Sequence, residues 1–213
     1  MHQPENGPSI DDLAVLAKEK LPTITTTAES KSVDTVMVFN LKQYNSRNIP
    51  DPVSTQLMKI TTAAFLGVEQ LGQTSLGTSC LRGELAGRSR IYVLYTAKEE
   101  LAGFSTVRAV EPGSTEANIT LTVIAPDYQG KGVVGHLMQE IEKNLWETGY
   151  RTLIREARTD NGWASTLHRH YGERIIATFT GETDKNPPRI GLRIKLVDPN
   201  NTRPSEQVIS SSS

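Results

Sequence analysis

The chain has 213 residues, 37% of them apolar, and its 23 basic and 24 acidic side chains leave a net charge of −1. This near-neutral balance gives no general reason to expect a polyanionic partner, and no run of about 20 apolar residues predicts a transmembrane helix. The single cysteine, Cys80, excludes an intramolecular disulfide and a cysteine-based zinc cluster, and the first residues lack the features of a secretory signal. We therefore expect a soluble, cytoplasmic protein without a bound metal.

The two ends of the chain are predicted to be tails that flank one domain. Residues 1–32 contain one candidate short helix, capped by Ser9, and then a Thr-rich stretch. Residues 199–213 are polar, contain prolines and end in four serines, which predicts disorder. The intervening residues 33–198 carry regular patterns, and we expect them to fold as a single domain.

Strand and helix patterns follow one another through the first half of this domain. β-branched residues predict a strand at 33–41, and apolar residues at helical spacing predict helices at 53–70 and around 81–86. Three strand patterns come next, separated by the hairpin-like segments KEE and EPGSTE, at residues 89–97, 101–110 and 117–125. These short connections predict antiparallel pairing.

The second half alternates helices with strands. Residues 133–148 place apolar side chains along one helix face, which leaves His136 on the solvated side. Patterns for a strand, a helix and two further strands follow at residues 152–156, 161–172, 173–181 and 189–197. The strand–helix–strand order predicts a parallel pair, so the fold class is α/β, with a mixed sheet of six or seven strands and helices on both faces.

The most informative segment is the glycine-rich loop at the start of the helix at 133–148. Gly130, Gly132 and Gly135 lie where backbone N–H groups point outward without intrahelical partners. Such a helix start, at the positive end of the helix dipole, suits a phosphate or pyrophosphate, and Lys131 could add a charge. Alternatively, the glycines only shape a tight turn. The spacing does not fit a Walker loop, and we do not assign the loop as the dinucleotide fingerprint, although the three glycines follow the spacing G-x-G-x-x-G.

This loop resembles the acyl-CoA-binding loop of the GNAT superfamily of N-acyltransferases, whose pattern is Arg/Gln-x-x-Gly-x-Gly/Ala. Gln129 and Gly132 match the first and fourth positions, whereas Val134 occupies the sixth, where the family has glycine or alanine. The element order deduced above is also the order of that family. The resemblance therefore implies a GNAT-like fold over residues 33–197.

A second segment is similar to the family motif Asn-x-x-Ala-x-x-Leu-Tyr-x-x-x-Gly-Phe on the helix after the fifth strand. The positions in register are Asn161, Ala164, Leu167 and Gly172. His168 stands where the family usually has tyrosine, and Glu173 stands where it has phenylalanine. Two linked motifs on the expected elements imply acyl transfer from acetyl-CoA, or another acyl-CoA, to an amine.

The resemblance also implies which residues bind the acyl-CoA. Its pyrophosphate would lie on the backbone of Gln129, Gly130, Lys131, Gly132, Val133, Val134 and Gly135. Its pantetheine arm would pair with the strand end at Val123, Ile124 and Ala125, where a backbone N–H would polarise the thioester carbonyl. Asn161 and Ser165 of the following helix would contact the cofactor as well.

The sequence indicates the catalytic residues and the acceptor site less directly than the cofactor site. His168 could donate a proton to the leaving thiolate or accept one from the amine, or it is a surface histidine without such a role. Glu116 and Glu156 are candidate bases, and each is also explained as an exposed carboxylate at a strand end. For the acceptor amine we expect contacts from Asp184 and Arg189, in the connection between the last two strands.

The leading hypothesis is a single-domain N-acyltransferase that uses acyl-CoA and modifies the primary amine of a small molecule or a protein. Two alternatives remain: the same fold with a carrier-protein or aminoacyl-tRNA donor, and a degenerate fold that acts as a non-catalytic CoA-binding or interaction module. The near-neutral charge disfavours a tRNA donor. A homodimer is compatible with each of these hypotheses.

Overall fold

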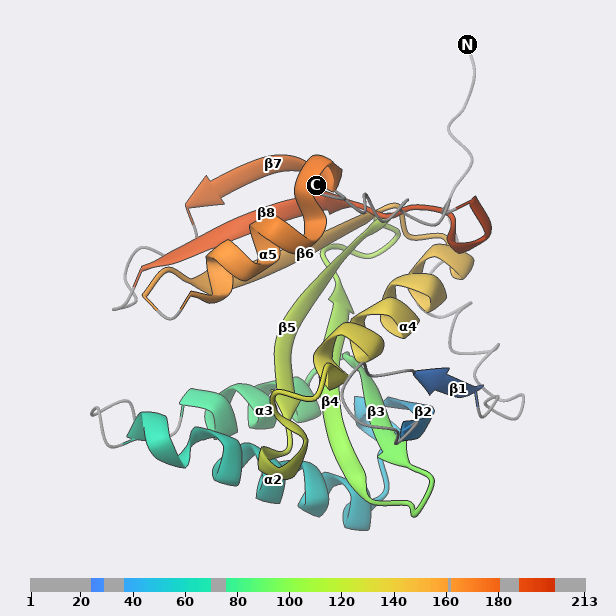
Figure 1. Ribbon diagram of the computed structural model, residues 1–213, viewed down its shortest axis with the longest axis vertical. Coiled ribbons are helices and arrows are strands. Elements are labelled where there is room, and N and C mark those ends of the chain that lie inside the picture. The colour runs from blue at the N-terminus through green and yellow to red at the C-terminus, as the bar shows by residue number, and fades with distance from the viewer. Residues whose placement is uncertain (1–23, 29–36, 70–75, 161, 181–187, 202–213) are drawn as a thin grey trace, which may run out of the picture.

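The computed structural model describes residues 24–28, 37–69, 76–160, 162–180 and 188–201 (Figure 1). The predicted helix within residues 1–32, the last residues of the C-terminal tail, Asn161 and Asp184 lie outside these ranges. The strands are β1 Ile24–Ala28, β2 Met37–Asn45, β3 Arg90–Thr96, β4 Leu101–Ala109, β5 Glu116–Ile124, β6 Thr152–Arg158, β7 Ile175–Thr180 and β8 Arg189–Lys195. The helices are α2 Asp51–Glu69, α3 Leu76–Ala86, α4 Val133–Glu147 and α5 Trp163–Tyr171.

The strands form one mixed sheet in the order β1-β2-β3-β4-β5-β6-β8-β7. Neighbouring strands from β1 to β5 are antiparallel, as the short hairpins predict. Strands β5 and β6 are parallel, and α4 connects them. Strand β8 lies between β6 and β7 and is antiparallel to both. The mixed sheet of the sequence-based prediction is therefore confirmed.

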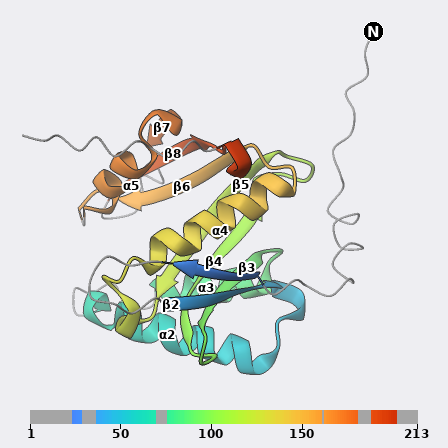
Figure 2. The same ribbon diagram turned by 45° about the vertical axis from the view of Figure 1, so that its right-hand side comes forward.

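Helices cover both faces of the sheet. On one face, Leu57 of α2 and Leu81 of α3 pack with Ile91, Val93 and Phe104 in one buried cluster. On the opposite face, a larger cluster joins α4 and α5 to the strands β2 to β6 and β8, and partly buried Ile175 at the start of β7 packs against it. Figures 1 and 2 show α4 and the α2–α3 pair on opposite sides of the central strands.

Strand β1 lies in the segment that we expected to be an N-terminal tail. Its residues, Ile24 to Ala28, pair with Leu41 to Met37 of β2 and add an eighth strand at the edge of the sheet. The sequence ITTTA is rich in β-branched residues, which favour extended backbone. The seven strands of residues 33–198 match the upper end of the predicted number.

The prediction for His136 on α4 was wrong. Its side chain is only 9% exposed, and its ring centroid lies 5.6 Å from that of Phe39 on β2. Burial lowers the pKa of His136 from its ordinary value, although the nearby Glu140 carboxylate acts in the opposite direction. The buried surface of α4 therefore extends beyond its apolar residues to include His136, because Phe39 of β2 packs beside this histidine.

Candidate active site

Strands β5 and β6 separate halfway along their length. They pair from Glu116–Thr152 to Ile119–Arg155, and within the described residues the pairing ends there. Beyond that point β5 continues against β4, whereas β6 continues against β8 (Figure 1). Each strand consequently presents an edge of backbone N–H and C=O groups toward the opening, and an extended ligand can pair with such an edge.

A β-bulge at Thr120 marks the place where the strands part. Thr106 of β4 lies opposite Leu121, but its neighbour Val107 lies opposite Ile119, so Thr120 is the additional residue. The bulge reverses which face the side chains take. Ile119 belongs to the α4 side of the core, whereas Leu121 packs on the α2–α3 side. The sequence alternation alone did not reveal this reversal.

The glycine-rich loop follows β5 directly and begins α4 at the mouth of the opening. Gly130 and Gly132 have φ of 74° and 75°, in the left-handed region that favours glycine. A Cβ atom at either position would meet no heavy atom within 4 Å, so the surface above the loop is open. The side-chain amide of Gln129 donates a hydrogen bond to the Ile124 carbonyl at 3.1 Å and fixes the loop to the strand end.

The start of α4 has the electrostatics of an anion site. The N–H groups of Gly135 and His136 donate to the Gly132 carbonyl, at 3.0 and 3.3 Å, and earlier N–H groups of a helix have no acceptor inside it. The Lys131 ammonium lies 5.7 Å from the ring centroid of Tyr128, beside the loop. Val134, the departure from the family pattern, packs partly buried against the core. Its side chain therefore does not crowd the open side of the loop.

Helix α5 carries the second predicted motif. It begins after Gly162, whose φ is 73°, and buries Leu167 and Tyr171 against the core. Ser165 and His168 are exposed on the other side of the helix. The structure therefore leaves the His168 imidazole accessible to solvent and to a ligand.

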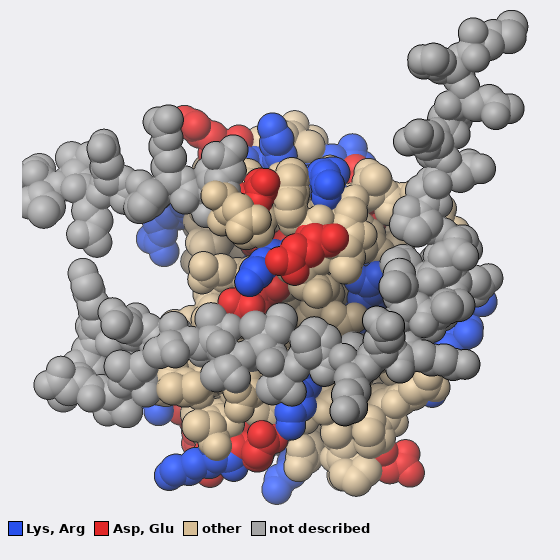
Figure 3. Space-filling view, turned by 90° about the vertical axis from the view of Figure 1, so that its right-hand side faces the viewer, with Lys and Arg blue, Asp and Glu red and all other residues tan. Residues whose placement is uncertain are grey.

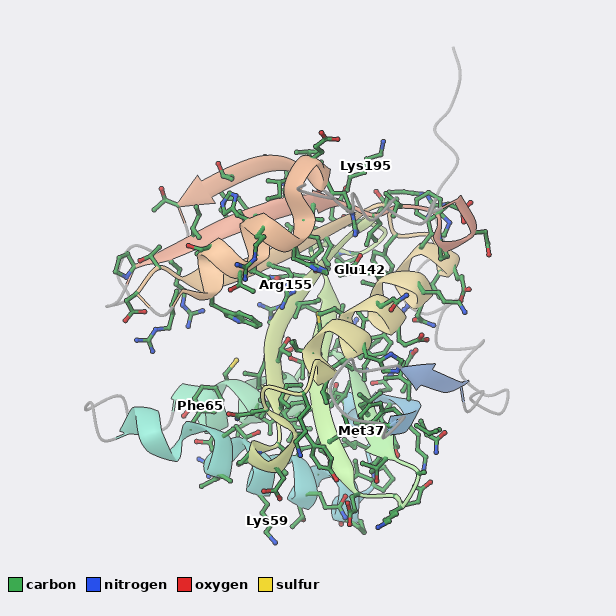
Figure 4. The ribbon with its side chains drawn as sticks, in the orientation of Figure 1. Met37, Lys59, Phe65, Glu142, Arg155 and Lys195 are labelled. Carbon is green, nitrogen blue, oxygen red and sulfur yellow. The ribbon has the colours of Figure 1, made fainter. Side chains whose placement is uncertain are left out.

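Tyr171 belongs to a polar network that sequence reasoning did not find. Its hydroxyl donates to Glu142 Oε1 of α4 at 2.9 Å and accepts from Arg155 Nη1 of β6 at 3.1 Å. Arg174 Nη2 donates to the other Glu142 oxygen at 2.5 Å. Figure 4 shows Glu142 and Arg155 meeting between α4 and β6, next to α5. Local sequence patterns do not predict these contacts, because the partners are between 16 and 32 residues apart in the chain.

This network makes Tyr171 a structural hydroxyl. Burial, the largest cause, raises the pKa of Tyr171 to about 12, with the Glu142 carboxylate adding to the effect and Arg155 opposing it. The hydroxyl thus stays protonated and bonded near neutral pH. It holds α5 against α4 and β6, whereas His168, three residues earlier, is exposed.

The two candidate bases lie at different distances from the opening. Glu116 begins β5, eight residues and about 26 Å from the strand end that carries the loop. It forms an ion pair with Arg193, whose Nε lies 3.1 Å from Oε1. Glu156 is the first residue of β6 beyond the last pair with β5, so its backbone borders the opening. Glu156 therefore borders the opening between β5 and β6, whereas Glu116 lies at the opposite, paired end of β5.

Arg189, the predicted acceptor residue, begins β8. Its Nη1 lies 3.8 Å from Glu156 Oε2, and both side chains are about three-quarters buried, at 24% and 28% exposure. Arg189 also lines a pocket where β7 ends and β8 begins, together with Thr178, Phe179, Thr180 and Ile190. The structure thus joins two residues that the sequence placed in separate roles.

Taken together, a splayed parallel strand pair and a glycine-rich helix start at its mouth define an α/β protein with a free strand edge next to an open helix N-terminus. The family model for the acetyltransferase (GNAT) family matches residues 56–172, more than half of the chain. The chain belongs to the acetyltransferase (GNAT) family and is an enzyme of that family. A comparison with curated proteins gave no match.

Solved structures share the fold at low sequence identity. The ribosomal-protein-S18-alanine N-acetyltransferase from Escherichia coli aligns with a TM-score of 0.55 and 16% identity, over 76% of this chain and 99% of that one. A GNAT family acetyltransferase from Elizabethkingia anophelis, solved with acetyl-CoA bound, aligns at 0.51 and 15%, over 73% and 98%. The spermidine/spermine N-acetyltransferase from Vibrio cholerae aligns at 0.50 and 15%, over 73% and 92%.

None of the helices in the described ranges has the length and apolar character needed to cross a bilayer. Across the same residues, His, Cys, Asp and Glu side chains do not gather in groups of three or more as ligands of one metal ion would.

Proposed function

We propose that the protein transfers an acetyl or other acyl group from acyl-CoA to the primary amine of a small molecule or a protein. The observation that carries this proposal is the order of the elements at the opening. Strand β5 parts from β6 at Thr120, and the glycine-rich loop that begins α4 follows the end of β5. One extended ligand with a pyrophosphate could therefore contact both the free strand edge and the helix start.

The residues of the opening fit acyl-CoA. The backbone N–H groups from Gln129 to Gly135 would hold the pyrophosphate, on a loop surface that a Cβ at Gly130 or Gly132 would not fill. The end of β5 at Val123 and Ile124, with Ala125 directly after it, would pair with the pantetheine arm. When bound, acyl-CoA supplies an activated thioester, and a backbone N–H of this edge would stabilise negative charge on its carbonyl oxygen.

Two side chains are proposed for proton transfer. Glu156, at the opening, would accept the proton that the attacking amine loses as its nitrogen bonds to the acyl carbon. His168, exposed on α5, would give a proton to the sulfur as the carbon–sulfur bond breaks. The products are an amide and free CoA, so all atoms and protons are accounted for. Ser165, on the same exposed side, and Asn161 stay predicted cofactor contacts.

Acyl-CoA is preferred here over a tRNA-borne donor. On the face shown in Figure 3, basic and acidic side chains are interspersed over the coloured surface, whereas phosphate contacts along a tRNA need a basic face. The acceptors named for two structural neighbours, an alanine of a ribosomal protein and a polyamine, differ from each other. The fold therefore leaves the acceptor open, and assembly as a homodimer stays a prediction.

The proposal is tested by following release of the CoA thiol from acetyl-CoA in the presence of single amines: an amino acid, a polyamine and a short peptide. We expect at least one amine to raise thiol release well above the amine-free rate, with formation of the acetylated amine seen by mass spectrometry. Acetyl-CoA binding without acceleration by any amine class would contradict the proposal and favour the non-catalytic binding module.

A further inference from the structure

One face of the C-terminal part of the sheet has no helix packed on it within the described residues. Leu153, Leu192 and Ile194 of β6 and β8 point toward α4 and α5. Alternate residues point the opposite way, and the cluster under α2 and α3 includes no residue of β6, β7 or β8. This uncovered face begins where β5 and β6 part, so it borders the opening.

Three residues form a row across the uncovered face. Glu156 of β6 lies opposite Gly191 of β8, which in turn lies opposite Phe179 of β7. A Cβ at Gly191 would come within 2.1 Å of the Phe179 ring, so the ring lies directly over the glycine. Phe179 is still 38% exposed. The row therefore places the Glu156 carboxylate, the backbone of Gly191 and the Phe179 ring side by side.

Arg189 completes the arrangement, and its ion pair is looser than those of Arg158 and Arg193 on the same face. It lies two residues before Gly191 on the same side of β8, 3.8 Å from Glu156, beyond hydrogen-bond distance. By contrast, the neighbouring Arg158 makes two hydrogen bonds to Asp160, at 3.0 and 2.7 Å. The Glu156 carboxylate and the Arg189 guanidinium thus keep hydrogen-bonding capacity for a third group.

We propose that this uncovered face binds the acceptor, and that the acceptor is an amine with a carboxylate on the same carbon, that is, a free α-amino acid. Arg189 binds the carboxylate, Glu156 receives the amine at the opening, and Phe179 contacts the side chain. An α-amino acid replaces one loose ion pair by two charge-assisted hydrogen bonds, because its two charges lie one carbon apart. This inference rests on the proposed N-acyltransferase function.

The charge balance of the face favours a zwitterion over a polycation. Arg158, Arg189 and Arg193 each lie beside one acidic residue, Asp160, Glu156 and Glu116 respectively. A polyamine would gain from a surplus of carboxylates, whereas each of these three carboxylates already faces a guanidinium. A ligand with one positive and one negative group matches this pattern without leaving either charge unpaired.

The experiment compares amino acids with the amines that lack only the carboxylate. Acetyl transfer from acetyl-CoA is measured for phenylalanine and phenethylamine, leucine and 3-methylbutylamine, and histidine and histamine. We expect kcat/KM to be about tenfold or more higher for the amino acid of at least one pair. In Arg189→Gln the preference should fall to about twofold or less, mainly through KM for the amino acid.

The matched control is Arg193→Gln, on the same strand and face but paired with Glu116 at the far end of β5. This variant should keep the preference for the carboxylate. Equal or better use of the decarboxylated amines by the wild type would overturn the inference, and so would equal loss of preference in the two variants. A titration with acetyl-CoA distinguishes failure of the proposed function from failure of this inference. Absent binding of acetyl-CoA would overturn the proposed N-acyltransferase function. Binding of acetyl-CoA together with acetyl transfer that does not depend on the carboxylate would overturn only the inference that the acceptor is an α-amino acid.

Discussion

The two halves of the sheet use similar sequences in different surroundings. Strand β3, RIYVLYT, is buried at its five central positions between α2–α3 on one side and α4 on the other. Strand β7, IIATFT, is just as rich in β-branched and aromatic residues, yet five of its six positions are exposed at the edge of the sheet. The comparison indicates that the central strands supply stability, whereas the edge strand β7 leaves its side chains exposed.

The largest expected effect separates these halves directly. Ile141→Ala removes a side chain that is 0% exposed on α4 and should lower the free energy of unfolding by about 2–5 kcal/mol. Ile176→Ala makes the same change at a β7 position that is 55% exposed and should cost about 0.5 kcal/mol or less. Urea denaturation of both variants measures the difference. Similar losses in the two would break the comparison.

The next effect concerns the network that joins the halves. Tyr171→Phe leaves Arg155, only 5% exposed, without the hydroxyl that accepts its hydrogen bond, and should cost about 1–3 kcal/mol of folding stability. The folded-state pKa of Tyr171, about 12, is above its ordinary value of about 10, so its contribution is full below pH 10 and disappears as the pH rises toward 12. The variant should therefore lose less stability than the wild type between those pH values. An identical pH dependence would assign the alkaline loss to other tyrosines.

A third effect tests the exposed side of α5. His168→Ala should lower turnover with acetyl-CoA by about tenfold or more while the affinity for CoA stays the same, because the proposed role is proton transfer to the leaving sulfur. His170→Ala is the matched control, since this histidine is also exposed on the same helix. Steady-state kinetics and CoA titration are the measurements. Unchanged turnover in the His168 variant would show that His168 is a surface histidine without a catalytic role.

The smallest effect sharpens the account of the covered half. The pKa of the buried His136 is lowered, so its neutral form stabilises the fold above the ordinary value near 6.5, and this contribution decreases as the pH falls below that value. His136→Leu should flatten the fall of the urea midpoint between pH 7.5 and 5.5, whereas His170→Leu should leave that fall unchanged. A steeper fall in the His136 variant would contradict the buried, neutral state.

Much of the fold was predictable because its signals are local. The helical spacing from Val133, the hairpin connections and the glycine-rich loop each lie within about 15 residues, and the corresponding elements are confirmed. The burial of His136 was not predictable, because it depends on β2, about 100 residues earlier in the chain. The bulge at Thr120 was equally hidden, since it leaves the alternation of the sequence intact while reversing the faces.

The site was predictable only where a motif carries it. In the loop from Gln129 to Gly135, Gly130 and Gly132 have the positive φ values that glycine favours. By contrast, Glu116 and Glu156 look alike in the sequence, and only the end of the β5–β6 pairing distinguishes them. The association of Glu156 with Arg189 across β6 and β8 likewise requires the strand register, which residue patterns alone do not give.

The central claim is that the start of α4 binds the pyrophosphate of acyl-CoA, and calorimetric titration with acetyl-CoA tests it most directly. The variants are Gly132→Glu, in the loop, and Gly113→Glu, whose glycine has a nearly identical φ of 76° and equally open surroundings between β4 and β5. Both substitutions carry the same backbone strain and the same charge. Micromolar binding by the wild type and Gly113→Glu, with affinity about tenfold or more weaker in Gly132→Glu, is the predicted result. Absent binding by the wild type near millimolar concentration, or equal affinity in the two variants, would contradict the account.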